Sequence, residues 1–381
     1  MRGLDGLRAA AILLVVLWHC ATLTRFPQAA LGPLLPLVSA GWAGVDLFFA
    51  LSGFLITRLI LQEEETRGGP IDLKAFYARR ALRILPAFYL VLGLNLLGTR
   101  WQVLAPAVGE TSGGPLEWVS LLTYWSNYFF IHFEARNPAP ALLLFWSLCV
   151  EEHFYLLWPF FLRVVRRPAA RIGLGLGLCL LFLVARLASP LGAGAVQTLS
   201  HLRMDSILWG AIGALGFESL RSGVRWPRLV LMLLSGLIAT LFATGFLSGS
   251  PGRFQQAVGL SFVALFCTAL VVYVAARPAS RLTSLLDVPP LRAIGRVSYG
   301  MYLLHMQAIV LATALVVRFD RTASIQVFSG VALLAIGMTY AAASLMYVTF
   351  ESPFLRLKRH FRPGFGAPTG SAASPTPRGR S

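Results

Sequence analysis

Arg8 and His19 lie eleven residues apart in one apolar run near the start of the 381-residue sequence. Eleven residues advance an α-helix by three turns and about 20°, so both side chains project from one face, about 16 Å apart along the axis. An arginine there could bind a phosphate, while a buried imidazole on the same stripe takes a proton from a hydroxyl. The alternative interpretation is that Arg8 caps the helix and that His19 is a core histidine with satisfied hydrogen bonds.

A second polar group, Asp46, lies with Ser52 in the segment from Gly44 to Ile56, which is otherwise apolar. The small residues of this segment allow close packing between helices. Asp46 could either orient His19 or pair with an arginine.

The third cluster is the most costly one to bury in lipid. Glu151, Glu152 and His153 are consecutive in the segment that runs from Ser147 to Tyr155. An ionisable residue within a transmembrane segment costs a few kcal/mol or more, so these side chains are candidates for function. The HExxH pattern of metalloproteases is absent from this segment.

A fourth group consists of Ser298, Tyr302 and His305, at positions i, i+4 and i+7 of an apolar run. This spacing puts the three side chains on one helical stripe. The stripe could serve the reaction, or it could be an aromatic packing seam with a polar cap.

Arg80 and Arg83 are one helical turn apart between the second and third apolar runs. Positive charge at the cytoplasmic boundary would explain them as membrane anchors. Bidentate binding of a phosphate is the more specific hypothesis.

The elements that must hold these residues are transmembrane helices. The sequence is 56% hydrophobic and 13% charged, with a mean hydropathy of +0.69, whereas soluble domains carry about 25% charged residues. Because a helix needs about 20 mostly apolar residues to cross a bilayer, we expect an all-α polytopic bundle of about ten transmembrane helices. The predicted segments are Gly6–Thr24, Gly41–Leu61, Ile84–Gly98, Leu142–Leu162, Ile172–Leu187, Met204–Phe217, Leu229–Phe246, Val258–Val274, Ser298–Val317 and Val327–Thr349.

Basic residues are distributed unequally between the two sides of this bundle. With ten helices, 24 of the 33 Lys and Arg residues lie on the side of the termini and 8 on the other. The positive-inside rule therefore predicts that both termini of this multi-pass protein are cytoplasmic. The same asymmetry explains the net charge of +17 without nucleic acid as a partner.

We expect one transmembrane domain over residues 1–360 and a disordered cytoplasmic tail over 361–381, where Pro, Gly, Ser, Ala and Arg predominate. The first apolar run lacks a small-residue cleavage site, so it is predicted to be the first helix rather than a signal peptide. The four cysteines form no CxxC pair, and neither a disulfide framework nor a metal site is expected.

These motifs, in this order, resemble those of the acyltransferase 3 family of bacterial membrane O-acyltransferases, and the resemblance spans nearly the whole chain. Arg8 and His19 fit the family's Arg/Lys-x10-His element, Gly44 to Ile56 fits its aromatic Leu-Ser-Gly-Phe segment, and Arg80-x-x-Arg83 fits its paired arginines. The further matches are Ser147 to Tyr155, Arg203-x-Asp205, Ser298 to His305 and Glu351-x-Pro353. Cys149 and His153 depart from the family, in which Ser and Gln are common at these positions.

The resemblance implies transfer of an acyl group, commonly acetyl, from a cytoplasmic thioester such as acetyl-CoA to a hydroxyl of a sugar or related acceptor. Acyl-CoA would be a co-substrate, and no bound cofactor or metal is implied. The resemblance also implies a multi-pass protein of the bacterial inner membrane. Many relatives carry an additional esterase-like domain, for which this chain has no room, so a stand-alone form is expected.

The hypothesis assigns three roles to residues of this sequence. His19 is the base, oriented by Asp46, Glu151 or Glu152, and Arg8, Arg80 and Arg83 bind the donor phosphates. Support of the acceptor or of the structure is expected from Ser147, His153, Tyr155, Arg203, Asp205, Ser298, Tyr302, His305 and Glu351.

Two other classes of protein stay open at this point. Buried carboxylates could belong to a proton-coupled transporter, although no pair of broken helices recurs in the two halves of the sequence. A structural partner that uses its polar residues only to join helices is the third interpretation.

Overall fold

The computed structural model describes residues 1–24, 26, 28–98, 114–132, 140–223, 226–243, 253–318 and 324–361. Within these ranges the chain forms helices and no strand, which confirms the all-α class. The main helices are α1 (Leu4–Leu23), α3 (Ala43–Arg67), α4 (Leu73–Gly98), α9 (Trp146–Val164), α10 (Pro168–Ala188), α13 (Asp205–Leu215), α15 (Trp226–Ala243), α16 (Arg253–Ala276), α19 (Ser298–Val316) and α20 (Ile325–Met346). The shorter ones are η1 (Gln28–Leu34), α2 (Leu35–Ser39), α6 (Pro115–Leu122), α7 (Ser126–His132), α8 (Pro140–Leu143), α11 (Ala193–Thr198), α12 (Ser200–Arg203), α14 (Phe217–Gly223), α17 (Arg281–Leu286), α18 (Pro289–Arg296), η2 (Tyr347–Glu351), α21 (Ser352–Leu357) and η3 (Lys358–Phe361).

Seven helical stretches among the described residues are long and apolar enough to cross a membrane. They are Leu4–Leu23, Leu31–Arg67, Leu73–Leu97, Pro168–Ala188, Gln256–Ala276, Ser298–Val316 and Ile325–Phe361. The other predicted segments correspond to α9, which carries two glutamates, to α13 with eleven residues, and to α15. The chain is thus a multi-pass helical membrane protein, and the count of about ten spans remains a prediction.

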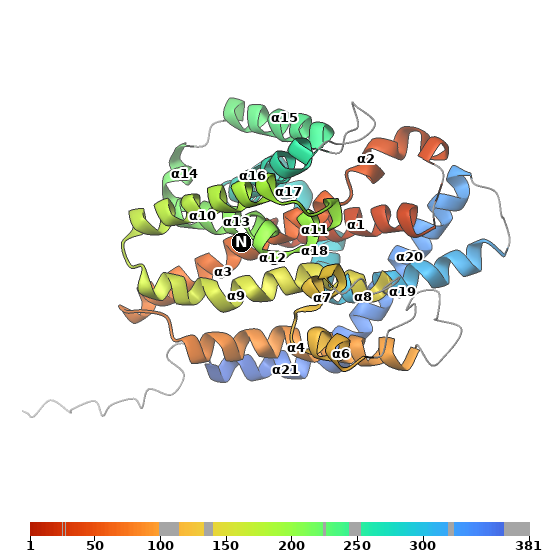
Figure 1. The fold of residues 1–381 in the computed structure, drawn as a ribbon, viewed down its shortest axis with the longest axis horizontal. Coiled ribbons are helices and arrows are strands. Elements are labelled where there is room, and N and C mark those ends of the chain that lie inside the picture. Colours follow the sequence, from red (N-terminus) through yellow and green to blue (C-terminus); the bar gives the residue numbers. More distant parts are fainter. Residues whose placement is uncertain are drawn as a thin grey trace, which may run out of the picture.

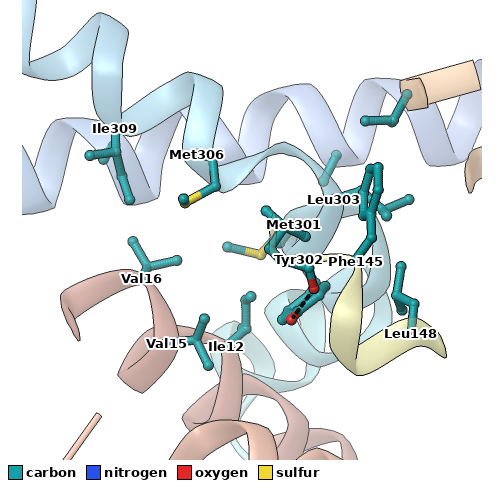
Figure 2. Packing of buried hydrophobic residues seen from close by; sticks show 14 of the residues in the cluster. Ile12, Val15, Val16, Phe145, Leu148, Met301, Tyr302, Leu303, Met306 and Ile309 are labelled. Carbon is teal, nitrogen blue, oxygen red and sulfur yellow. Dashed lines mark hydrogen bonds between the residues drawn. The ribbon is translucent and has the colours of Figure 1, made fainter. Parts of the chain in front are cut away.

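Helix α1 lies in the core of the bundle. Ile12, Val15 and Val16 of α1 are fully buried and pack with Met301 and Ile309 of α19 (Figure 2). In Figure 1, α4, α9 and α10 run roughly along the longest axis of the molecule. The histidine and arginine of α1 are therefore carried by a helix with neighbours on several sides.

Helices α3 and α13 cross at very short range because each contributes a glycine. A Cβ atom at Gly53 would lie 2.0 Å from the Ile207 carbonyl oxygen, and one at Gly210 would lie 2.2 Å from the Ala50 carbonyl oxygen. No side chain fits there, so the small residues fix the separation of the two backbones.

Several helix boundaries differ from the predicted ones, and the start of α4 differs most. Helix α4 begins at Leu73 rather than at Ile84, so Arg80 and Arg83 lie inside a helix and not in a loop between helices. The last predicted segment ends at Thr349, whereas α20 ends at Met346. It is followed directly by the π-helical turn η2, whose last residue is Glu351, and then by α21. The first turns of α4 carry charged residues and are not part of the apolar run, which explains why the predicted helix starts too late.

The predicted disordered tail falls almost entirely outside the described residues, which end at Phe361. The carbonyl oxygen of Phe361 accepts a hydrogen bond from Arg79 of α4 at 2.6 Å. The last described residue is therefore held against α4.

Candidate active site

A cavity of about 230 Å³ opens between α1, α3, α4, α9 and α19. The predicted site residues that line it are Arg8, Arg80, Arg83, Ser147, Glu151, Glu152, Tyr155, Ser298 and Tyr302. Arg83 is exposed, Arg8 and Arg80 are half-buried, and Ser147 and Tyr302 are buried. The cavity thus has an open end rich in arginine and a closed end between α9 and α19.

The arginines come from two helices and converge on the open end. Arg80 and Arg83 project from consecutive turns of α4, and the Arg80 guanidinium carbon lies 5.5 Å from the centre of the Tyr155 ring. Arg8 of α1 is paired with Asp5 at 2.8 Å. Neither Arg80 nor Arg83 forms an ion pair within the described residues. Positive charge is therefore available to an anionic ligand, for which guanidinium groups are well suited.

The two glutamates enter the cavity from α9. Glu151 Oε1 accepts hydrogen bonds from the Ser52 hydroxyl of α3 and from the Tyr155 hydroxyl one turn along α9. Glu152 lines the same cavity. Ser52 had stood out in the sequence only as a polar residue beside Asp46, because its contact lies 99 residues away.

The closed end is formed by a hydroxyl pair. Ser147 Oγ lies 2.6 Å from Tyr302 Oη, and Tyr302 also donates to the Leu144 carbonyl oxygen at 3.2 Å. The Phe48 ring packs edge-on against Tyr302, with 6.1 Å between the ring centres. Ser298 and Tyr302 of the predicted stripe reach the cavity, whereas His305 lies outside its lining.

His19 and His305 contact each other beyond this closed end. Their Nδ1 and Nε2 atoms, respectively, are 3.1 Å apart, and the His305 ring lies 5.5 Å from the Tyr302 ring. His19 is outside the cavity lining as well. The expectation that Asp46, Glu151 or Glu152 orients His19 is wrong for this structure, in which an imidazole from α19 contacts it. The sequence separation of 286 residues hides this partnership from any local pattern.

Asp46 takes the other role considered for it and pairs with an arginine. Its Oδ2 accepts from Arg203 at 2.8 Å, and both side chains are buried. Arg203 also donates to Ser206 at 2.5 Å and lies over the Phe49 ring at 5.8 Å. The pair joins α3 to α12, and neither member lines the cavity.

Asp205 forms a second buried pair, with Arg186 of α10. The guanidinium donates to both carboxylate oxygens, at 2.6 and 2.7 Å, and Ser261 of α16 donates to Asp205 at 2.8 Å. The eight basic residues counted on the side opposite the termini included Arg203, which is buried, and Arg186. Counting Arg186 there is wrong, because its side chain is fully buried. The one indication of this burial in the sequence was the position of Arg186, one residue before the end of the predicted segment Ile172–Leu187.

His153 points away from the cavity, towards the segments between the long helices. Its Nδ1 lies 2.7 Å from Ser200 Oγ, and its ring lies 4.8 Å from the ring of Trp125. Nearby, Tyr128 Oη lies 3.0 Å from His201 Nδ1. The departure from the family at position 153 therefore affects this outer aromatic cluster and not the cavity.

Glu351 lies beside the start of α19, since a Cβ atom at Gly300 would be 3.4 Å from its Oε1. Glu351 does not line the cavity. In the described part of the chain, no group of three His, Cys, Asp or Glu side chains is placed to hold a metal ion.

The chain matches one protein family and is similar to several bacterial O-acetyltransferases. Residues 1–348 match the family model described as an acyltransferase domain, Acyl_transf_3. The chain is 33% identical over 338 residues to a putative peptidoglycan O-acetyltransferase, YrhL, of Bacillus subtilis, which covers 82% of this chain and 49% of that protein. It is 30% identical over 371 residues to the peptidoglycan O-acetyltransferase OatA of Listeria monocytogenes, and 27% identical over 372 residues to the O-acetyltransferase OatA of Staphylococcus aureus.

These two matches cover 92% of this chain and 55% and 56% of the relatives, so the chain spans about half the length of the curated proteins it matches. No solved structure matches the chain.

Proposed function

The chain belongs to the acyltransferase 3 family, and from this premise we propose that it transfers an acyl group, in the first place acetyl, from acyl-CoA to a hydroxyl of a cell-envelope carbohydrate. The observation that carries the proposal is the cavity, where Arg8, Arg80 and Arg83 surround an open end between membrane helices. The relatives of the chain support a cell-envelope carbohydrate as the acceptor, because two of them are named for peptidoglycan O-acetylation.

The donor would bind with its phosphates at the arginines. Three guanidinium groups complement the phosphates of coenzyme A, and α1 rises about 16 Å from Arg8 to His19, which suits an extended pantetheine arm. If the termini are cytoplasmic, as the distribution of basic residues predicts, the arginine end of the cavity faces the cytoplasmic pool of the donor.

The reaction needs a base near the thioester carbonyl. His19 would take the proton of the acceptor hydroxyl while that oxygen attacks the carbonyl carbon. The carbon–sulfur bond then breaks, and the thiolate of coenzyme A takes up the proton that His19 received, which restores the neutral imidazole. Ser147 and Tyr302 line the cavity and His19 does not, so in this mechanism the hydroxyl pair would move before an acyl group in the cavity reaches His19.

The proposal can be tested with membranes that contain the full chain. Acetyl-CoA labelled in the acetyl group is added, and alkali-labile label is followed in peptidoglycan, in other envelope glycans and in extractable metabolites. We expect ester-linked label in a glycan fraction, and a loss of that label in Arg80→Ala. Arg281→Ala, which removes an exposed arginine outside the cavity, is the matched control and should retain the label.

Absence of label from every fraction, with acetyl-CoA and with longer acyl-CoA donors, would contradict the proposal. It would favour proton-coupled transport, for which Glu151 and Glu152 in the cavity would be the proton-binding groups.

A further inference from the structure

His305 lies between two fixed hydrogen-bonding groups. On one side its Nδ1 is 2.7 Å from the carbonyl oxygen of Tyr302, and on the other its Nε2 is 3.1 Å from His19 Nδ1. The side chain is fully buried on α19, whereas His19 is half-buried on α1. Within the described residues no carboxylate hydrogen-bonds to either ring.

This arrangement determines where the protons lie. A carbonyl oxygen only accepts, so the Nδ1 of His305 must carry hydrogen and donate it to Tyr302. A neutral imidazole has one N–H, and His305 Nε2 is therefore an acceptor. The contact of 3.1 Å with His19 then requires hydrogen on His19 Nδ1. The remaining nitrogen of His19, Nε2, is left with its lone pair.

We propose that His305 is a positioning residue that holds His19 in this tautomer, so that Nε2 of His19 is the atom that receives the proton of the acceptor hydroxyl. The inference rests on the proposed function and adds to it the identity of the basic nitrogen and the group that selects it. When His19 becomes an imidazolium, its Nδ1 hydrogen still has an acceptor in His305 Nε2. The partner is a neutral imidazole, so the resting pair adds no net charge to the core of the bundle, where an ion would be costly.

The test measures the rate of acetyl transfer from labelled acetyl-CoA to solubilised peptidoglycan fragments, with purified full-length protein in lipid nanodiscs. His305→Leu removes the side-chain partner of His19 Nδ1 and places an apolar side chain in the core. Because general base catalysis contributes on the order of 10²–10⁴-fold, we expect kcat to fall about 100-fold or more, with KM for acetyl-CoA changed less than about threefold. His305→Gln offers an amide oxygen in place of Nε2 and should recover at least about tenfold of the loss.

A double-variant cycle separates positioning from a merely structural role. If His305 acts through His19, the change His305→Leu should have almost no further effect in a His19→Ala background. Thr313→Val, which removes a hydrogen bond to a backbone carbonyl elsewhere on α19, is the matched control and should keep the native rate.

Native activity in His305→Leu, equal losses in His305→Leu and His305→Gln, or additive losses in the double variant would each overturn the inference. If His305→Leu kept native activity while His19→Ala was inactive, His19 would still act as the base, and His305 would not be needed to position it. Absence of transfer by the native protein would instead contradict the proposed function.

Discussion

Arg80 and Arg83 show how a pair of side chains can be recognised in a sequence while its setting cannot. Their spacing of one turn predicts a shared helical face, and the structure has both on α4, lining one cavity with Arg8. The third arginine comes from α1, and no local pattern joins it to the other two. Charge at this end of the cavity is the property on which the donor hypothesis depends.

We predict that Arg83→Ala raises KM for acetyl-CoA while kcat changes little, because the contact is made before and during the reaction alike. A hydrogen bond to a charged group contributes about 1.5–3 kcal/mol, which corresponds to roughly a 10- to 100-fold change in KM. Steady-state kinetics over a range of acetyl-CoA concentrations provide the measurement. Arg281→Ala controls for the loss of one positive charge, and a fall in kcat at constant KM would argue against a donor-binding role.

At the scale of elements, the polar residues divide into those that line the cavity and those that hold helices together. The pairs Asp46–Arg203 and Asp205–Arg186 join α3 to α12 and α10 to α13, and all four side chains are buried. Asp46 looked functional because a carboxylate is costly in lipid, although burial cost alone does not distinguish a reactive group from a paired one. The distinction needs the partner, which for Asp46 is 157 residues away.

The Asp205–Arg186 pair predicts a specific pattern of stabilities. Arg186→Leu leaves a buried carboxylate without its cation, so we expect a loss of about 3–5 kcal/mol in the free energy of unfolding. The double variant Arg186→Leu with Asp205→Leu removes both charges and should be more stable than Arg186→Leu alone. Thermal unfolding in one detergent, followed by intrinsic fluorescence, compares the three proteins with the native chain. Additive losses in the double variant would contradict a direct coupling.

How far the sequence predicts the elements depends on what each prediction used. Apolar runs locate helices well, because hydrocarbon thickness imposes their length. They fail at the first turns of α4, where charged residues belong to the helix, and at Arg186, where a buried cation resembles a boundary. The partnership of His19 with His305 depends on how α1 packs against α19, which is a tertiary property.

For the whole molecule, the distribution of basic residues sets the orientation if ten helices cross the membrane. The sequence has 24 on the side of the termini and 8 opposite, and two of the eight, Arg186 and Arg203, are buried. The seven long apolar helices establish several crossings. Whether the shorter or more polar helices α9, α13 and α15 also cross decides whether the number of crossings is even or odd. Orientation matters for function because the arginine end of the cavity has to meet the donor.

We predict that a green fluorescent protein fused after the last residue is fluorescent in intact bacterial cells, since it folds to the fluorescent form on the cytoplasmic side. An alkaline phosphatase fusion at the same position should be inactive. The opposite outcome would place the C-terminus outside and the arginines away from cytoplasmic acyl-CoA.

Whether His19 is the base is tested by comparing the purified native protein with purified His19→Ala, with labelled acetyl-CoA and peptidoglycan fragments as substrates. Binding of acetyl-CoA is measured on the same samples by equilibrium dialysis. We predict ester-linked label on the fragments with the native protein. In His19→Ala the rate of labelling should fall at least about 100-fold, with donor binding within about threefold of native. Transfer at the native rate by His19→Ala would contradict the assignment of His19 as the base.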